Sequence, residues 1–383
     1  MIPTSRLGRA GRLLGSALGP VSGVATLGRL KGGAHKLGQT LALVADSMPA
    51  DVRERLGGLF GAAEPRPWDE VKGALDALPA GLLAEVEPAP FAAASMGQVH
   101  RGRLDDGRVV AIKLLYPGVA AALRADLDNL ETVAVPARLV GGGAQMLAGL
   151  RGALLAELDL RVEAAHGAAM AEALRPWPRL HVATPIYATQ DVLVAELIVG
   201  PTLHNVLRPV GPGPADPQGL AEDLVAAVLG PVFSAAKVNA DAHPGNLIVT
   251  ETGLGVIDLA AVATVPDVPT LEAALNRALA GHREGVLEGL GVHAGALEKD
   301  LQGLLGPLGP GPWDFGHDTL LEQLGELKRK KPLALRHLPF ATERLPLIRA
   351  VMGLHHALRR LGVPFALGEH LRRVRARAHG AAG

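Results

Sequence analysis

The sequence predicts an α+β protein with a small β-rich lobe and a mostly helical lobe, preceded by a helical N-terminal extension. Short apolar runs separated by turn residues concentrate in residues 89–200, whereas apolar residues recur at helical spacing through most of residues 201–383. Residues 1–88 show helical spacing and no strand pattern. We therefore assign residues 1–88 to the extension, 89–200 to the β-rich lobe and 201–383 to the helical lobe. For such an arrangement, we expect a ligand cleft between the two lobes.

The composition excludes several classes of protein. Lysine plus arginine and aspartate plus glutamate both number 38 among 383 residues, and this balance argues against a nucleic-acid binder. Because the chain contains no cysteine, disulfides, thiolate catalysis and cysteine-based metal sites are excluded. The hydrophobic share of 48% is typical of a folded globular protein.

No segment has the pattern of a membrane span or a secretory leader. The longest uncharged stretch, Leu13–Gly28, contains four glycines and a proline and falls short of the ~20 apolar residues that a span needs. The terminal stretch His370–Arg377 is basic, but it lacks a bulky apolar face, so a solvated helix end is favoured over an interfacial anchor. We therefore expect a cytoplasmic protein with at most peripheral membrane contact.

The extension is expected to contain two helices. In residues 34–60, apolar side chains recur at helical spacing from Leu37 to Met48. A linker containing two prolines and a tryptophan follows at Glu64–Trp68, and residues 69–86 are expected to form the second helix.

The β-rich lobe is expected to begin with a hairpin. Gln98–Leu104 and Arg108–Leu115 have strand patterns and are joined by Asp105-Asp106-Gly107, which is typical of a hairpin turn. The other elements expected in this lobe are two helices and two β runs, at 118–134, 146–173, His181–Ala188 and Val192–Ile198.

The helical lobe follows a linker rich in glycine and proline, Val210–Pro217. It is expected to contain a helix, a short β pair around Glu251-Thr252-Gly253, and a helical remainder interrupted at glycines and prolines. These elements are 219–238, Asn246–Thr250 with Gly255–Asp258, and 267–380 with breaks at 306–307, 309–312 and Pro364.

The first residue with chemical interest is Lys113, which ends the apolar run that begins at Val109. A lysine at the end of a buried strand can direct its ammonium group into a cleft and bind phosphate there. Lysines at strand ends also snorkel to solvent without any ligand, so this interpretation requires partners.

Acidic partners follow in the segment from Glu157 to Glu163, which we expect to be helical. At 100° per residue, Glu157 and Asp159 face different sides of the helix, whereas Asp159 and Glu163 share a face. A solvated acidic face explains Asp159 and Glu163 better than Glu157, whose neighbours are apolar. One carboxylate can therefore orient the Lys113 ammonium.

A stronger pattern is Asp241-Ala242-His243-Pro244-Gly245-Asn246, followed by Ile257-Asp258. An acid five residues before an asparagine, with a second acid about a dozen residues later, is the catalytic layout of protein kinases. Asp241 has the chemistry to position a nucleophile, and Asn246 and Asp258 are residue types that bind Mg²⁺. Each of these residues alone is more often a turn residue, but their order behind a lysine and a glutamate favours the kinase interpretation.

Two more motifs lie outside that layout. Lys36-Leu37-Gly38-Gln39 belongs to the extension, and the alanine-rich segment from Ala92 to His100 precedes the Lys113 hairpin. Successive alanines restrict φ and stiffen a loop that is glycine-rich in kinases, although an ordinary apolar strand is the alternative. With Glu157-Leu158-Asp159 and Asp241 to Asn246, these motifs resemble the UbiB/AarF family of atypical kinase-like proteins over about residues 2–265.

The resemblance implies a protein-kinase-like bilobal fold that binds ATP with Mg²⁺. It implies that Lys113 and Glu157 form the ion pair that orients ATP, and that Glu163 is the partner of Lys36. Lys36 and Gln39 are expected to fold over the cleft.

The resemblance also implies a role for each site residue. Asp241, Lys113 and Glu157 are expected to be catalytic, and Asn246 and Asp258 are expected to bind the metal. The residues expected to bind the nucleotide are Ala92, Ala93, Ala94, Ser95, Lys113, Glu196, Lys36 and Gln39.

Four departures from the family pattern fall near these residues. The Asp-Phe-Gly of the family is Asp258-Leu259-Ala260 here, which keeps the metal ligand and loses a glycine. The other departures are Asn239 in place of histidine, Ala242 in place of proline and His166 in place of asparagine. None of them removes a charged catalytic group.

Members of the family act in or support isoprenoid-quinone biosynthesis, often at membranes. We therefore expect Mg-dependent ATPase or small-molecule phosphotransfer activity, with a lipid or quinone precursor as a partner besides ATP and ADP. The alternative is a nucleotide-gated scaffold without physiological turnover, which the departures favour. A small-molecule kinase of the aminoglycoside or choline type shares the Asp…Asn…Asp layout but leaves the motif at Lys36–Gln39 unexplained.

Overall fold

The protein, seen in a computed structural model, divides into two compact units. The first unit comprises residues 1–165 and 184–197, and the second comprises residues 166–183 and 198–383. The structure describes residues 65–93, 96–124, 128, 151–152, 155–208, 213–282, 286–289, 291–292, 295, 298–309, 311–330 and 342–380. The helix expected at 34–60 therefore lies outside the described residues.

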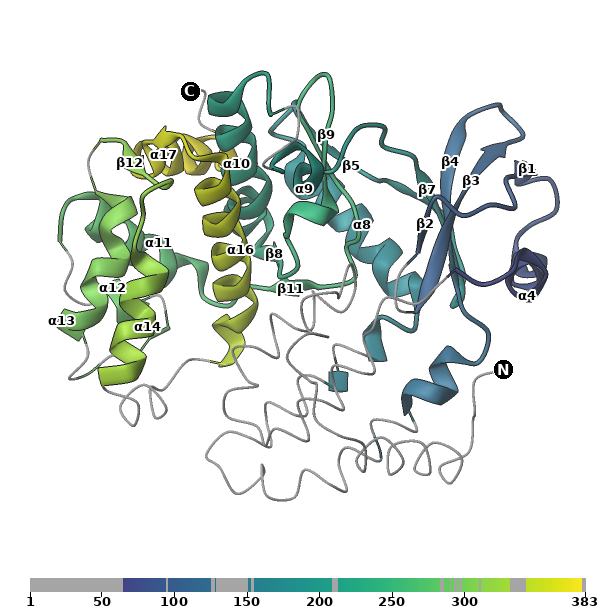
Figure 1. Cartoon of the computed structure of the whole chain (residues 1–383), viewed down its shortest axis with the longest axis horizontal. Coiled ribbons are helices and arrows are strands. Elements are labelled where there is room, and N and C mark those ends of the chain that lie inside the picture. Colours follow the sequence, from purple (N-terminus) through teal and green to yellow (C-terminus); the bar gives the residue numbers. More distant parts are fainter. Residues whose placement is uncertain are drawn as a thin grey trace. The chain divides into compact units, whose positions relative to one another are not determined.

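The first unit is built on a six-stranded antiparallel sheet (Figure 1). Its strand order is β1-β3-β4-β7-β6, and β2 pairs with β3 off this path. The strands are β1 Leu83–Val86, β2 Ala92–Ala93, β3 Gly97–Leu104, β4 Val109–Leu115, β6 Pro185–Ala188 and β7 Val192–Glu196.

The central hairpin, β3 and β4, confirms the strand pattern in the sequence. The two strands pair antiparallel from Gly97–Leu115 to Arg103–Val109, and Gly107 in the turn adopts a φ of 87°. Glycine is the residue that reaches this left-handed conformation without strain. Alternate residues of β4 from Val110 to Leu114 are buried in an apolar cluster, so Lys113 lies on the opposite face of the sheet.

The prediction of a helix at 69–86 is wrong for the second half of that range. Helix α4 (Trp68–Val71) and a 3₁₀ helix, η2 (Lys72–Ala77), are followed by β1. The helical run ends at Ala77, because Leu78 has an extended backbone. Gly81 in the intervening turn has a φ of 81°, and Leu83–Val86 then pairs with β3. Pairing with the edge of β3 overrides the local helical spacing.

The linker before α4 is fixed to the sheet by two fully buried polar side chains, Gln98 and His100. The Arg66 N–H donates to Gln98 Oε1 at 2.8 Å, and Gln98 Nε2 donates back to the Arg66 carbonyl at 3.2 Å. His100 Nδ1 donates to the Glu87 carbonyl at 2.8 Å, so its Nε2 accepts from Gln98 Nε2 at 2.9 Å. Both hydrogens of the Gln98 amide thus have an acceptor. The Trp68 ring packs against the His100 ring in a tilted arrangement, with the ring centroids 4.9 Å apart.

The helix expected at 146–173 is interrupted in its described part. Residues 155–156 are helical, 157–158 form a turn, and α8 spans Leu160–Leu174. The side chain of Asp159 accepts a hydrogen bond from the Arg161 N–H at 3.1 Å and caps the new helix. Of the helix expected at 118–134, the structure describes residues 119–124 and Asp128 as helical.

The second unit places a small sheet beside a long buried helix, α10 (Pro217–Ala235). Strand β10 (Leu254–Val256) pairs antiparallel with β9 (Leu247–Val249), as the β pair in the sequence predicts, and parallel with β5 (Leu180–Val182). The run expected at His181–Ala188 therefore divides, because β5 and β6 join different sheets.

Helix α10 ends earlier than the expected 219–238. Its C-cap, Ala236, has a φ of 52°, and the chain then forms β8 (Lys237–Asn239), which pairs antiparallel with β11 (Val262–Thr264). The left-handed turn at Ala236 thus starts the strand that leads directly into the Asp241 segment.

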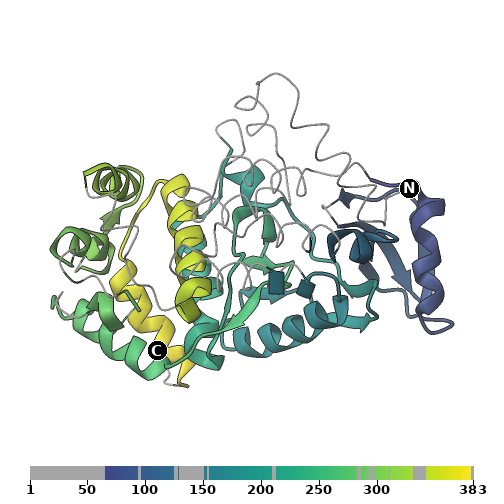
Figure 2. The ribbon, with the colours of Figure 1, turned by 90° about the horizontal axis from the view of Figure 1, so that it is seen from below.

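The remaining elements of the second unit are mostly helical, as predicted. Figure 1 and Figure 2 both show the yellow C-terminal helices α16 and α17 packed beside α10. The elements are α9 Leu203–Val206, η3 Pro244–Asn246, α11 Val268–Leu279, α12 Val286–Gly289, α13 Glu298–Leu301, η5 Gln302–Leu308, β12 Trp313–Asp314, α14 Leu320–Lys330, η6 Thr342–Arg344, α16 Leu345–Leu361, β13 Pro364–Phe365 and α17 Leu367–Ala378.

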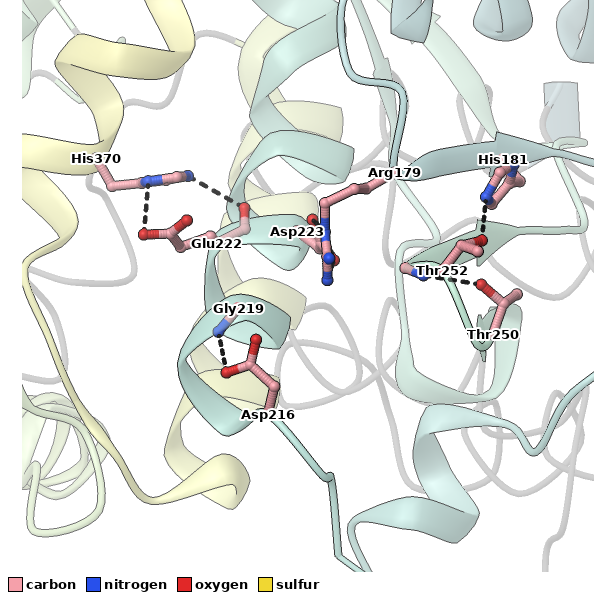
Figure 3. A network of polar contacts seen from close by, with 10 residues as sticks. Arg179, His181, Asp216, Gly219, Glu222, Asp223, Thr250, Thr252 and His370 are labelled. Carbon is pink, nitrogen blue, oxygen red and sulfur yellow. Dashed lines mark hydrogen bonds and ion pairs between the residues drawn. The ribbon is translucent and has the colours of Figure 1, made fainter.

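One face of the basic helix α17 is docked on the protein, whereas Arg372, Arg373 and Arg377 are exposed, so the expectation of a solvated helix end holds for its outer face. His370 Nε2 donates to the Glu222 carbonyl of α10 at 3.1 Å (Figure 3). Arg372 donates to the Leu279 carbonyl at 2.6 Å, and Arg375 pairs with Glu272 of α11 at 3.3 Å. The side chains of Arg372, Arg373 and Arg375 therefore make contacts within the second unit.

The N-terminal half of α10 has its own polar contacts, also drawn in Figure 3. Asp216 caps the helix by accepting from the Gly219 N–H at 2.9 Å. Asp223, about two turns further on, is paired with Arg179 at 2.9 Å, which fixes the segment before β5. Burial raises the pKa of Asp223, and the Arg179 guanidinium opposes that shift. Within the described part of the chain, no helix is long and apolar enough to cross a membrane.

Candidate functional site

Lys113 is held in the first unit by an ion pair with Glu163. Lys113 Nζ donates to Glu163 Oε2 at 2.6 Å, and the two side chains are 22% and 8% exposed. Lys113 comes from the non-core face of β4 and Glu163 from the first turns of α8. Because a buried charge is costly without a partner, this short contact is a favourable place for both side chains.

This contact gives Lys113 a carboxylate partner that the sequence does not predict. The expected pairing of Lys113 with Glu157 stays a prediction, and so does that of Glu163 with Lys36, because Lys36 lies outside the described residues. Because Asp159 caps α8, Glu157 lies in the turn before the helix, and Glu163 is the carboxylate that the helix directs to Lys113.

The structure places the other expected residues of this unit on strands or outside its described part. Ala92 and Ala93 form β2 and pair with Val99 and Gln98 of β3. Glu196 is the exposed last residue of β7. Lys36, Gln39, Ala94 and Ser95 lie outside the described residues, so their roles stay predictions.

In the second unit, Asp241 and Asn246 are joined directly. Asn246 Nδ2 donates to Asp241 Oδ2 at 2.9 Å and to the Asp241 carbonyl at 3.1 Å, and both residues are buried. Because both amide hydrogens are used on Asp241, Oδ1 is the atom of Asn246 that can bind a cation. Asp241 is positioned in turn by its own N–H, which donates to Asn239 Oδ1 at 3.0 Å.

His243 completes the turn between Asp241 and Asn246. Its Nδ1 accepts from the Gly245 N–H at 2.9 Å, so a neutral ring carries its proton on Nε2, 4.0 Å from Asp241 Oδ2. A Cβ on Gly245 would lie 2.5 Å from His243 Cε1, so the ring requires glycine there. His243 has an extended backbone before Pro244, as a residue preceding proline prefers.

Asp258 follows β10 and is tied to the same turn through its neighbour. The Ile257 N–H donates to the Asn246 carbonyl at 3.0 Å, which fixes the start of the Asp258 segment next to Asn246. Asp258 itself has a φ of 56°. The next carbonyl, of Leu259, contacts His166 Nδ1 of α8 at 3.1 Å.

The structure therefore brings the expected residues together in two groups, one in each unit. Lys113 and Glu163 form the first, and Asp241, Asn246 and Asp258 form the second. The contacts made by Glu163, Asn239 and His166 were missed from the sequence. The only indication there was that Asn239 and His166 depart from the family pattern.

The second group has the donors that Mg²⁺ prefers. Among the described residues, no three histidine, aspartate or glutamate side chains converge as a complete metal cage. Mg²⁺ is usually bound by one or two carboxylates together with waters and substrate phosphates. One amide oxygen on Asn246 and one carboxylate on Asp258 fit that mode of binding.

Comparison with known proteins gives one family match and several relatives. Residues 64–268 match the family model described as the ABC1 atypical kinase-like domain. The probable protein kinase UbiB of Marinobacter nauticus is 31% identical over 230 residues, which cover 56% of this chain and 41% of that protein. The probable protein kinase UbiB of Cellvibrio japonicus is 31% identical over 263 residues, which cover 65% of this chain and 45% of that protein. The mitochondrial atypical kinase COQ8B of Rattus norvegicus is 33% identical over 213 residues, which cover 52% of this chain and 38% of that protein.

The chain spans less than half the length of these curated relatives. A solved structure, the complex of Rv3197 with erythromycin from Mycobacterium tuberculosis, is similar over 97% of this chain and 98% of that chain. The TM-score is 0.65 and the sequence identity is 24%, which shows a similar fold.

Proposed function

The chain belongs to the family of ABC1 atypical kinase-like domains, and from this premise we propose that it binds ATP with Mg²⁺ and transfers or hydrolyses the terminal phosphoryl group. The observation that carries the proposal is the 2.9 Å contact of Asn246 with Asp241, next to which the backbone fixes the Asp258 segment. An acid, an amide and a second acid are the set that phosphoryl transfer requires.

Each residue has a chemical task in this proposal. The Lys113 ammonium binds phosphate oxygens, and Glu163 keeps it in place. Asn246 Oδ1 and the Asp258 carboxylate would hold Mg²⁺, which neutralises phosphate charge when it is bound. The Asp241 carboxylate, oriented by Asn246, accepts the proton of the attacking hydroxyl or water.

The acceptor in this proposal is a small molecule of lipid or quinone-precursor type, and the activity supports isoprenoid-quinone metabolism. The support is the similarity to relatives named UbiB and COQ8B. Peripheral contact with a membrane surface belongs to the same proposal.

Turnover tests the enzyme interpretation. We expect Mg-dependent ATP hydrolysis that rises with lipid or phenol-like additives and falls about 10²-fold or more in Asp241→Asn. Asparagine at position 241 can still accept from Asn246, so the fold and the ATP affinity should be retained. Hydrolysis unchanged in Asp241→Asn contradicts the assigned role.

A nucleotide-gated scaffold is the second candidate, favoured by Leu259 and Ala260 in the segment after Asp258. Tight Mg·ATP binding without turnover under any of these conditions would support the scaffold and exclude the enzyme.

A further inference from the structure

The backbone at Asp258 is in a conformation that must be held by its surroundings. Its φ of 56° lies in the left-handed region, which aspartate tolerates at a cost of order 1 kcal/mol. Such a residue persists only where neighbouring contacts determine the backbone around it. The contacts on both sides of Asp258 therefore contribute to the position of its carboxylate.

On the N-terminal side, the contact is the backbone hydrogen bond from Ile257 to the Asn246 carbonyl at 3.0 Å. On the C-terminal side, the Leu259 side chain is buried in the main apolar cluster of the second unit and only 3% exposed. Burial fixes the Leu259 side chain, but it does not by itself orient the peptide group that follows. That peptide group is oriented by His166.

His166 Nδ1 lies 3.1 Å from the Leu259 carbonyl oxygen. A carbonyl oxygen only accepts, so Nδ1 is the nitrogen that carries the proton, and a neutral ring leaves Nε2 as an acceptor. The ring is half-buried and extends from α8, a fifteen-residue helix with an N-terminal cap at Asp159. A donor on a regular helix is a firm support for a strained loop.

We infer that His166 is a positioning residue, which holds Asp258 in its metal-binding conformation by donating from Nδ1 to the Leu259 carbonyl. The inference rests on the proposed function, because it concerns how well Asp258 receives Mg²⁺. His166 does not touch the metal or the nucleotide in this proposal. Its effect passes through one peptide group to the φ and ψ angles of Asp258.

Three substitutions separate this role from a general loss of packing. His166→Asn keeps an N–H donor near the place of Nδ1, His166→Gln moves the donor to the place of Nε2, and His166→Leu removes it. We expect the asparagine variant to resemble the parent protein. The glutamine and leucine variants should need about tenfold or more Mg²⁺ to bind ATP, while ATP affinity in EDTA changes less than about twofold.

Hydrogen–deuterium exchange gives a readout that does not require ATP. Amide exchange in the segment 257–261 should be faster in His166→Gln and His166→Leu than in the parent, and unchanged in His166→Asn. Melting temperatures establish that each variant is folded. Where His166→Leu does not fold, the comparison of asparagine with glutamine decides the question.

Asp258→Asn distinguishes failure of this inference from failure of the proposed function. If Asp258→Asn abolishes the Mg²⁺ dependence and His166→Gln leaves both it and the exchange unchanged, the role of His166 is overturned and the function stands. If Asp258→Asn leaves Mg·ATP affinity unchanged, the metal site fails, and the inference fails with it.

Discussion

Lys113 Nζ and Glu163 Oε2 lie 2.6 Å apart and form an ion pair that is largely shielded from solvent. The partner is the glutamate inside α8, three residues after its N-terminal end at Leu160. Because Glu163 lies within the regular helix, the helix backbone sets the direction of its side chain toward β4. That direction does not depend on the turn that contains Glu157.

Glu163→Gln should therefore weaken ATP binding more than Glu157→Gln does. Without the negative charge, the Lys113 ammonium is poorly placed, and we expect about a tenfold loss of affinity, equivalent to about 1.4 kcal/mol. The free energy of unfolding should fall by about 1–3 kcal/mol, because Lys113 loses its charged acceptor. Isothermal titration with ATP and urea unfolding of both variants measure the two effects. A larger loss of affinity in Glu157→Gln would contradict the pairing.

Gly245→Ala should disturb the turn between Asp241 and Asn246. The new Cβ would lie 2.5 Å from His243 Cε1, so the ring must move and its contact with the Gly245 N–H is lost. Such overpacking costs about 1–3 kcal/mol, which thermal unfolding will show. Gly73→Ala is the matched control, because nothing lies within 4 Å of its Cβ. Equal stability of the two variants would show that the ring does not depend on glycine.

Gln98→Met should detach the linker at Arg66 from the sheet. The methionine has nearly the same shape, but it leaves the partly buried Arg66 N–H and carbonyl without the two bonds that Gln98 makes. We expect a loss of about 2–4 kcal/mol in the free energy of unfolding, measured with urea. Arg101→Met, on the exposed side of the same strand, is the control and should change stability by less than about 0.5 kcal/mol.

Acid should weaken the docking of α17 through His370. Burial lowers the pKa of His370 below its ordinary 6.5, against the opposing effects of Glu222 and Glu369, and Arg373 lowers it further. The unfolded chain therefore takes up the proton before the folded protein does. The stabilisation is complete above about pH 6.5 and is lost as the pH falls through the lower pKa of the folded state.

His370→Gln tests this pH dependence, because glutamine can keep a donor near Nε2 and does not titrate. We expect the melting temperature of the parent to fall more steeply below pH 6.5 than that of the variant. Parallel curves for the two proteins would rule out a contribution from His370.

The sequence predicts the strands of the central hairpin and the β pair before Asp258 well, because both have local patterns that end at turn residues. The prediction of a helix at 69–86 is wrong for its last four residues, because they pair with β3. The local spacing of apolar residues contains no information about such a distant contact. The contact of Glu163 with Lys113 is not predicted for a related reason. The aspartate cap at position 159 sets the start of α8 at Leu160 and places Glu163 in the first turns of that helix, where its carboxylate reaches Lys113.

The contact of His166 with Leu259 joins residues 93 apart in the chain. Nothing in the local sequence of either residue specifies it. The roles of Asp241, Asn246 and Asp258 are easier to expect, since kinase chemistry ties residue types to their order in the chain.

Electron paramagnetic resonance of Mn²⁺ in the presence of ATP tests most directly whether Asn246 and Asp258 form a metal site. Mn²⁺ replaces Mg²⁺ at oxygen ligands, and coupling to ³¹P reports a metal bound to both protein and nucleotide. Asp267→Asn is the matched control, because Asp267 is also left-handed, with a φ of 47°, but caps α11. We expect protein-bound Mn²⁺ with ³¹P coupling in the parent and in Asp267→Asn, and its loss in Asp258→Asn. An unchanged bound spectrum in Asp258→Asn would contradict the metal site.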